Sequence, residues 1–307
     1  MKASVKVPAT SANLGPGFDC LGIAVSLYNE ITVEETEAGS GLEIYIIDEN
    51  KKNDILSLPK DENNLAYKAI ELLYNYLGRR VNGIKITIKA NIPSARGLGS
   101  SASLIAGGLY AANEILGRPA DNALLLSIAS EAEGHPDNVT PALFGGFCIS
   151  SMEDDGSVIY SKLNWPDKWK LAVIVPDYEL DTRISRSVLP EKINMTDAAY
   201  NVRKCAMLID AVCRQDDELM KKCLKDKMHQ PYRENLIIGF RELRELLAEK
   251  DDILGCVVSG AGPSVLVISK NNGFENALGE INSIFSSLNV SCDIKTLNVE
   301  KEGAKII

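Results

Sequence analysis

Apolar and polar residues alternate in two short segments of the first hundred residues, 42–46 and 84–88. Every second side chain is apolar in each, which predicts a strand with one buried face. Between these segments, residues 64–76 carry leucine, alanine and tyrosine side chains at the spacing of one helical face. The pattern therefore predicts strands that alternate with helices in this part of the chain.

Two further helices are predicted after residue 100. The segment Ser101–Leu116 is rich in small residues, which would let a helix lie tightly against a sheet. A second helix, from about Asp121 to Glu133, ends at Gly134. It leads into the polar segment 135–138, which we interpret as a turn.

At about residues 155–168 the composition changes to residues typical of loops. We therefore divide the chain there into domains 1–160 and 161–307. The second half predicts a β-α-β-β-α-β order, which suits a ferredoxin-like, two-layer lobe and an α+β class. The expected elements are a strand at Leu171–Val175, a long helical stretch from Thr196 to about Lys250, strands at Cys256–Ser259 and Val265–Ile268, a helix at Phe274–Leu288 and a last strand.

The chain carries a formal net charge of −9, from 42 acidic and 33 basic side chains. A field of this sign repels a polyphosphate backbone, so we expect no nucleic-acid partner. No segment approaches the roughly 20 apolar residues that cross a bilayer, so no membrane association is expected either. The 7 cysteines form no CxxC pair and only 2 histidines are present, which disfavours structural zinc and fits a reducing cytoplasm.

The tripeptide Gly-x-Gly occurs at Gly15–Gly17, Gly97–Gly99 and Gly260–Gly262. One such tripeptide usually marks only a tight turn, and none here continues into a dinucleotide-binding or Walker-type fingerprint. In the first loop, Asn13 and Asp19 can either hydrogen-bond a ligand or stabilise their own turns. The last loop is either a simple hairpin or a segment that closes over a ligand.

The middle loop, Pro93–Ser103, follows a predicted strand and opens a predicted helix. Glycines let consecutive backbone N–H groups converge on an anion, and the helix N-terminus adds partial positive charge. Ser100 or Ser101 would cap the helix and reach a phosphate oxygen or Mg²⁺. A capped helix that binds nothing is the alternative, but a cap needs one serine and no run of small residues. The loop therefore predicts a phosphate cradle.

A Mg²⁺ ion on those phosphates would also need a carboxylate. Glu131 and Glu133 both end the next predicted helix, on faces roughly 200° apart. Only one of them can point at the site, and the spacing does not decide which.

These motifs, in this order, resemble the GHMP kinase superfamily of galactokinase, homoserine kinase, mevalonate kinase and phosphomevalonate kinase. The resemblance rests on residues 7–19, 93–103 and 259–264, which together span nearly the whole chain. The first of these, and residues 133–139, resemble the homoserine kinase branch in particular.

The resemblance implies an N-lobe like ribosomal protein S5 domain 2, packed on a ferredoxin-like C-lobe, with the active site between them. It also implies a reaction in which ATP and L-homoserine give ADP and O-phospho-L-homoserine, a step of threonine synthesis. Mg²⁺ is the implied cofactor, the partners are these small molecules, and a homodimer is left open.

Residue roles follow from the same resemblance. The nucleotide would be bound by Pro93, Ser94, Ala95, Arg96, Gly97, Leu98, Gly99, Ser100, Ser101, Ala102 and Ser103, with Asn64. Ser101 and Glu131 would hold Mg²⁺; Glu131 is preferred over Glu133 because the family helix places its acid there. Homoserine would meet Asn13, Asp19, His135, Asp137, Asn138, Thr182, Arg186, Arg233 and Gly260. Arg186 and Arg233 would grip its carboxylate, a task that suits the planar guanidinium.

The amide of Asn138 cannot usefully accept a proton, and a loose phosphoryl-transfer transition state demands little of a base. We therefore expect catalysis by positioning and charge stabilisation, carried by Asp137, Asn138 and Arg186. The alternatives are a kinase of another small alcohol and a non-catalytic sensor of the same fold. The intact nucleotide loop disfavours the sensor.

Overall fold

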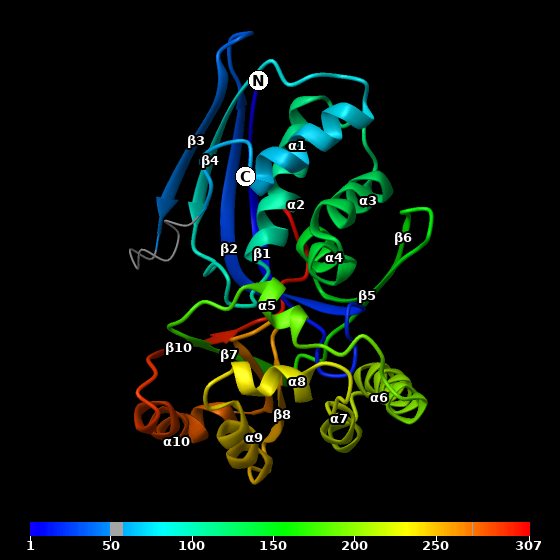
Figure 1. Ribbon diagram of the computed structural model, residues 1–307, viewed down its shortest axis with the longest axis vertical. Coiled ribbons are helices and arrows are strands. Elements are labelled where there is room, and N and C mark those ends of the chain that lie inside the picture. Colours follow the sequence, from blue (N-terminus) through cyan, green and yellow to red (C-terminus); the bar gives the residue numbers. More distant parts are fainter. Residues whose placement is uncertain (50–57, 272) are drawn as a thin grey trace.

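Two lobes, each built on one sheet, stack along the long axis of the molecule (Figure 1). The computed structural model describes residues 1–49, 58–271 and 273–307. The main path of the first sheet runs β11-β1-β2-β4-β3, and β5 and β6 extend it from β2. The strands are β1 (Lys2–Ala12), β2 (Leu21–Glu35), β3 (Gly41–Asp48), β4 (Gly83–Ala90), β5 (Phe147–Met152), β6 (Val158–Leu163) and β11 (Lys305–Ile306).

Four helices lie on one face of this sheet (Figure 1): α1 (Leu65–Tyr76), α2 (Ser100–Ile115), α3 (Asn122–Glu133) and α4 (Pro136–Phe144). The small residues of α2 allow it to sit between the sheet and α1. A Cβ on Gly107 would lie 2.6 Å from the side chain of Ile31, and one on Gly108 would lie 2.5 Å from the carbonyl oxygen of Ala66. The predicted tight helix is therefore confirmed.

The second lobe has a four-stranded sheet in the order β10-β7-β9-β8, with every neighbouring pair antiparallel. Its main elements follow the predicted β-α-β-β-α-β order, so the ferredoxin-like lobe and the α+β class are confirmed. In chain order they are β7 (Trp169–Pro176), α9 (Phe240–Ala248), β8 (Ile253–Val258), β9 (Val265–Lys270), α10 (Gly273–Ser287) and β10 (Cys292–Leu297).

Both faces of the second sheet are buried. Along β7, Ile174 belongs to a core with Phe240 and the other apolar residues of α9 and α10. The next side chain in the opposite direction, Val173, belongs to a core that includes Leu14 of the first lobe. Because this second core spans both lobes, it fixes their relative position by packing, which is what a site between lobes requires.

The long helix predicted for residues 196–250 is wrong. The chain breaks after α6 because Gln215 adopts a left-handed conformation (φ 55°) and Asp216 caps a new helix by accepting a hydrogen bond from Leu219 N. Residues 214–218 are all polar, but the apolar pattern resumes at Leu219 and Met220, which explains the error. The pieces are α6 (Met195–Arg214), α7 (Asp217–Cys223), α8 (Gln230–Arg233) and the 3₁₀ turn η1 (Glu234–Leu236), followed by α9.

Two other expectations differ from the structure. The segment 135–138, which we interpreted as a turn, is the first turn of α4, with His135 at its N-cap. The domain boundary drawn at 160 falls inside β6, and β11 returns to pair with β1. Within the described ranges, no helix is long and apolar enough to cross a membrane.

Asn29 of β2 connects the first sheet to the predicted phosphate-binding loop. Its Oδ1 accepts the backbone N–H of Ile92 at 2.9 Å, and its Nδ2 donates to Ser103 Oγ of α2 at 2.8 Å. Asn29 is 1% exposed. One buried amide therefore holds both ends of the loop that separates β4 from α2.

Asn29→Ala is expected to lower the free energy of unfolding by about 2–3 kcal/mol, because it leaves the buried N–H of Ile92 without its acceptor. Chemical denaturation checks this value. Glu30→Gln is the matched control, since Glu30 makes only an exposed ion pair with Lys89, and it is expected to change stability by about 0.5 kcal/mol or less. Equal effects of the two substitutions would contradict the role of Asn29.

Candidate functional site

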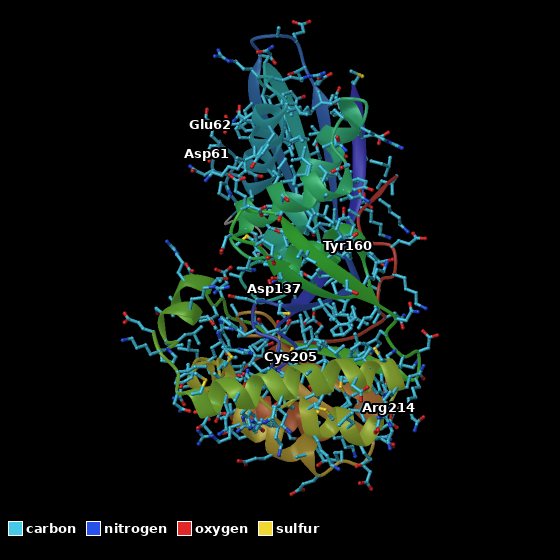
Figure 2. All side chains as sticks on the ribbon, turned by 90° about the vertical axis from the view of Figure 1, so that its right-hand side faces the viewer. Asp61, Glu62, Asp137, Tyr160, Cys205 and Arg214 are labelled. Carbon is cyan, nitrogen blue, oxygen red and sulfur yellow. The ribbon has the colours of Figure 1, made fainter. Side chains whose placement is uncertain are left out.

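A pocket of about 170 Å³ lies at the junction of the lobes. Figure 2 shows Asp137 of α4 at this level, above the helix that carries Cys205. The wall is formed by the β1–β2 loop, the loop before α2, the α3–α4 junction, α5 (Thr182–Ser187), α8 and the β8–β9 turn. The lining residues are Asn13, Asp19, Pro93, Ala95, Arg96, Gly97, Leu98, Gly99, Ser100, Ser101, Glu133, His135, Asp137, Asn138, Thr182, Arg186, Arg233, Gly260 and Ala261.

Two glycines let the loop before α2 approach its neighbours closely. Gly97 and Gly99 have φ values of 73° and 66°, in the left-handed region. A Cβ on Gly97 would lie 2.2 Å from the carbonyl oxygen of Ser259, and one on Gly99 would lie 1.9 Å from Thr10 Oγ1. At these two positions the loop therefore contacts its neighbours through its backbone alone. One of its carbonyl oxygens, Gly97 O, accepts a hydrogen bond from Ser259 Oγ of the β8–β9 turn at 2.6 Å.

The first residues of α2 differ from the expectation in one respect. Gly99, and neither Ser100 nor Ser101, is the N-cap, and no side chain caps the helix. A left-handed glycine replaces the serine cap because the loop turns too sharply for a side chain. The N–H groups at the start of α2 therefore have no capping side chain and line a pocket where an anion can bind them.

Glu133 is the acid that faces this helix start. Ser101 Oγ donates to Glu133 Oε1 at 2.5 Å. Glu131 is exposed and accepts a hydrogen bond from Tyr76 of α1 at 2.9 Å. The preference for Glu131 over Glu133 is therefore corrected, because the helical spacing that separates the two acids turns Glu131 away from the pocket.

Burial raises the pKa of Glu133, against the lowering effects of the hydrogen bond from Ser101 and of the charge of His135. His135 in turn lies with its Nδ1 2.6 Å from Asp137 Oδ1. Burial lowers the pKa of His135, but the hydrogen bond and charge of Asp137 outweigh burial, so the net shift is upward. The α3–α4 junction therefore places two carboxyl groups, Glu133 and Asp137, next to the imidazole of His135.

The start of α4 places its polar side chains in a chain of hydrogen bonds. Asn138 Nδ2 donates to Asp137 Oδ1 at 3.2 Å, and Asn138 Oδ1 accepts from Thr10 Oγ1 at 2.8 Å. Asp137 is 1% exposed. These two hydrogen bonds fix the orientation of the Asn138 amide, with its oxygen toward Thr10 and its nitrogen toward Asp137. Thr10, on β1, was not among the predicted residues; a buried threonine gives no signal in the sequence.

The β1–β2 loop brings two more predicted residues into the wall. Asn13 and Asp19 both have positive φ, 72° and 54°. Asn13 donates from Nδ2 to Gly260 O at 2.9 Å and accepts at Oδ1 from the N–H of Asp19 at 3.0 Å. Asp19 binds the guanidinium of Arg186 through two hydrogen bonds, of 2.7 and 3.1 Å. Asn13 therefore stabilises its own turn, which is one of the two roles considered for it, and it also lines the pocket.

Arg233 is buried to 1% exposure, and its hydrogen-bond acceptors are all uncharged. They are Ser185 O at 3.2 Å, Gly260 O at 3.0 Å and His229 Nδ1 at 3.2 Å. No carboxylate that the structure describes lies within ion-pair distance of it. Burial, followed by the charge of Arg186, lowers the pKa of Arg233 to about 10. A buried arginine without an acid partner is ready to receive an anion.

Four predicted nucleotide residues lie outside the pocket lining. Asn64 caps α1, accepting from Ala66 N at 3.0 Å, and is fully buried. Ser94, Ala102 and Ser103 are buried behind the loop. Asn64 therefore holds the start of α1, while Ala102 and Ser103 are small buried residues that let α2 pack closely.

Comparison with known proteins agrees with this arrangement. The family model for the N-terminal domain of GHMP kinases matches residues 64–146, and the model for the GHMP kinase C-terminal domain matches residues 208–285. Homoserine kinase of Clostridium botulinum (strain Langeland) is 40% identical over 302 residues, which cover 98% of this chain and 97% of the relative.

This chain belongs to the homoserine kinase family. The homoserine kinase of Caldicellulosiruptor saccharolyticus is also 40% identical, over 99% of this chain and 96% of its own. In structure, the chain is similar to homoserine kinase from Cytophaga hutchinsonii, with a TM-score of 0.88, 30% identity, and coverage of 100% of this chain and 97% of that one. The expected family and the two-lobed GHMP kinase fold are confirmed, and kinases of this family use ATP.

Glu133→Gln is expected to stabilise the folded protein at pH 8. Because burial raises the pKa of Glu133, the folded chain binds more protons than the unfolded chain just above the ordinary carboxyl pKa, and stability falls as pH rises through that window. The substitution removes this fall, raising the free energy of unfolding by about 1 kcal/mol at pH 8 and less at pH 5.

Urea denaturation at both pH values measures this difference. Glu131→Gln, at an exposed carboxylate two residues away, is the control and is expected to stay within about 0.5 kcal/mol of the unsubstituted protein. A Glu133→Gln protein that is less stable at pH 8 would contradict the expectation.

Proposed function

We propose that this chain transfers the γ-phosphoryl group of ATP to the side-chain hydroxyl of L-homoserine. The observation that carries the proposal is Arg233, a buried arginine whose acceptors are all uncharged and which lines the same pocket as the α2 helix start. One end of the pocket thus suits a polyphosphate and the other suits a small carboxylate. Mevalonate also carries a carboxylate, so the substrate is decided by experiment below.

The loop 93–101 would bind the phosphates of ATP. The N–H groups at the start of α2 and the left-handed glycines Gly97 and Gly99 support this role, because they present backbone donors with no side chain in the way.

Ser101 and Glu133 would hold the Mg²⁺ ion of the nucleotide. Their hydroxyl and carboxylate oxygens are adjacent and both line the pocket, which fits the hard oxygen ligands that Mg²⁺ prefers. Two protein ligands are enough, because Mg²⁺ commonly completes its shell with phosphate oxygens and water. When bound, the ion neutralises charge on the phosphates.

Homoserine would bind at the other end, with its carboxylate on Arg233. Arg186 is already paired with Asp19, so its role is to complete the wall and to stabilise developing negative charge. Asn13, Asp19, Thr182 and Gly260 also line this end, and Asp19 and the Gly260 carbonyl can accept hydrogen bonds from the substrate ammonium.

The hydroxyl of homoserine would lie near His135, Asp137 and Asn138. Asp137 Oδ1 already receives hydrogen bonds from both neighbours, which favours a fixed negative charge over a proton-accepting base. We therefore propose that these residues position the hydroxyl, and that its proton leaves late, to a phosphate oxygen or to water, as the bond to the leaving oxygen breaks.

A cytoplasmic location and the absence of nucleic-acid and membrane partners remain our predictions from composition. A homodimer also stays a prediction.

An assay of ADP release with L-homoserine, mevalonate, galactose and shikimate tests the function. Activity is expected with L-homoserine and not with the other three, because only homoserine combines a carboxylate, an ammonium and a primary hydroxyl at this spacing. Turnover of mevalonate without turnover of homoserine would overturn the substrate, and no ADP release from any of the four would favour the sensor.

Glu133→Gln is also expected to raise the Mg²⁺ concentration needed for half-maximal rate by about ten- to hundredfold, because it removes the charged metal ligand. Glu131→Gln is expected to leave this concentration within about twofold, since Glu131 faces Tyr76. Titration of the rate with Mg²⁺ at saturating ATP measures both. A larger effect from Glu131→Gln would reverse the assignment of the metal acid.

A further inference from the structure

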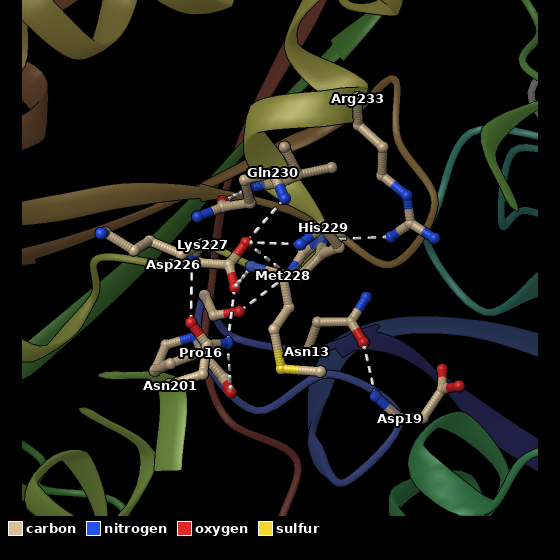
Figure 3. Close-up of polar contacts among 12 residues, drawn as sticks. Asn13, Pro16, Asp19, Asn201, Asp226, Lys227, Met228, His229, Gln230 and Arg233 are labelled. Atoms are coloured by element: carbon tan, nitrogen blue, oxygen red, sulfur yellow. Dashed lines mark hydrogen bonds and ion pairs between the residues drawn. The ribbon is translucent and has the colours of Figure 1, made fainter. Parts of the chain in front are cut away.

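The turn Asp226–Gln230 directly precedes the pocket residue Arg233 and is held by one buried carboxylate (Figure 3). Asp226 accepts the backbone N–H groups of Met228, His229 and Gln230 at 2.9, 2.9 and 2.6 Å, and the side-chain amide of Asn201 at 2.7 Å. With four donors on two oxygens, the carboxylate is fully used in fixing the backbone. The position of His229 is therefore set by its main chain.

The two ring nitrogens of His229 meet opposite partners. Nε2 lies 2.7 Å from the carbonyl oxygen of Gly15, which can only accept. Nδ1 lies 3.2 Å from Arg233 Nη1, which can only donate (Figure 3). These partners are both satisfied only by a neutral ring with its proton on Nε2. Burial lowers the pKa of His229, and the charge of Arg233 adds to this against the carboxylate of Asp226, whose Oδ2 lies 3.6 Å from Nε2; the net downward shift agrees with a neutral ring.

A neutral acceptor at this point has a specific consequence for Arg233. The guanidinium is held by His229, Ser185 O and Gly260 O, so no hydrogen-bonded carboxylate offsets its charge. The charge of Arg186, by contrast, is offset by the carboxylate of Asp19. A carboxylate at position 229 could hold Arg233 equally well but would compete with an incoming anion.

The ring also connects Arg233 to the first loop. Through Gly15 O it reaches the turn that carries Asn13 and Asp19, and its face stacks on Phe18 with centroids 5.3 Å apart. Phe18 in turn lies under the guanidinium of Arg233, at 5.4 Å from the ring centre. The His229 side chain therefore contacts both the arginine and the β1–β2 loop, and so helps to set the distance between them.

We propose that His229 is a positioning residue for the substrate carboxylate: as the neutral Nε2–H tautomer, it orients Arg233 without offsetting its charge. The inference rests on the proposed binding of the homoserine carboxylate by Arg233. His229, which does not line the pocket, would therefore affect the affinity for L-homoserine and not the affinity for ATP.

Two substitutions separate the ring nitrogens. The amide oxygen and nitrogen of asparagine lie as many bonds from Cβ as Nδ1 of histidine does. Those of glutamine lie as many bonds from Cβ as Nε2 of histidine does. His229→Asn can keep an acceptor for Arg233, whereas His229→Gln keeps only a donor for Gly15. We expect His229→Gln to raise KM for L-homoserine about tenfold or more, and His229→Asn to stay within about threefold. In both, KM for ATP and kcat are expected to stay within about twofold.

A merely structural histidine would instead alter both substrates or kcat together. Equal KM values for homoserine in the two variants, or an equal rise in KM for ATP, would overturn the proposal. If the unsubstituted protein has no homoserine kinase activity in the same assay, the proposed function fails, and the tautomer measured below is unaffected.

The tautomer is tested on the unsubstituted protein, so it does not depend on the folding of a variant. Only 2 histidines are present, and the long-range ¹H–¹⁵N spectrum of the folded protein resolves their ring nitrogens. His229→Gln, or His135→Gln if that variant does not fold, assigns the signals. At pH 7.5 we expect a protonated Nε2 and an unprotonated Nδ1 for His229. An imidazolium or a proton on Nδ1 would overturn the proposal.

Discussion

The site depends on a close contact between the backbones of turns that belong to different lobes. Ser259 Oγ donates to Gly97 O at 2.6 Å, and the N–H of Gly260 donates to Ala12 O at 3.2 Å. No side chain fits at Gly97, because a Cβ there would lie 2.2 Å from Ser259 O. The glycines matter here less for their flexibility than because they let three segments approach one another: the β1–β2 loop, the loop before α2 and the β8–β9 turn. Their contact sets the distance between the helix start that suits phosphate and the arginines that suit a carboxylate.

The local charge at the substrate end of the pocket differs in sign from the net charge of the whole chain. The chain is acidic overall, with a net charge of −9, yet the substrate end of the pocket gathers two arginines. One of them, Arg186, is paired with Asp19, and the other is held by neutral groups. An isolated buried cation is costly, and a protein keeps one where a ligand will share the charge. The distribution of charge, and not the net charge, therefore explains how an acidic protein can offer a site that suits both a phosphate group and a carboxylate.

Much of this could be read from the sequence because backbone chemistry leaves a strong local signal. The glycine loop, the small-residue helix and the order of strands in the second lobe depend on residue size and periodicity, and the fold confirms them. The break at Gln215 was missed because the apolar pattern resumes at Leu219, just after the left-handed Gln215 and the N-cap Asp216. The helix that begins at Pro136 was missed because its first turn has the composition of a loop. Polar pairs that form across the lobes, such as Arg186 with Asp19 or His229 Nε2 with Gly15 O, are decided by tertiary structure and have no signature in residue spacing.

The second lobe is an insertion within the first. The segment that follows β10 leaves the second sheet, forms a bridge between Val299 and Val25, and ends as β11 beside β1 (Figure 1). During synthesis the first sheet therefore lacks an edge strand until residues 305 and 306 have left the ribosome, after the whole second lobe. Exposed strand edges invite pairing with other chains. The speed with which β11 docks on β1 would accordingly influence how much of the newly made protein escapes aggregation.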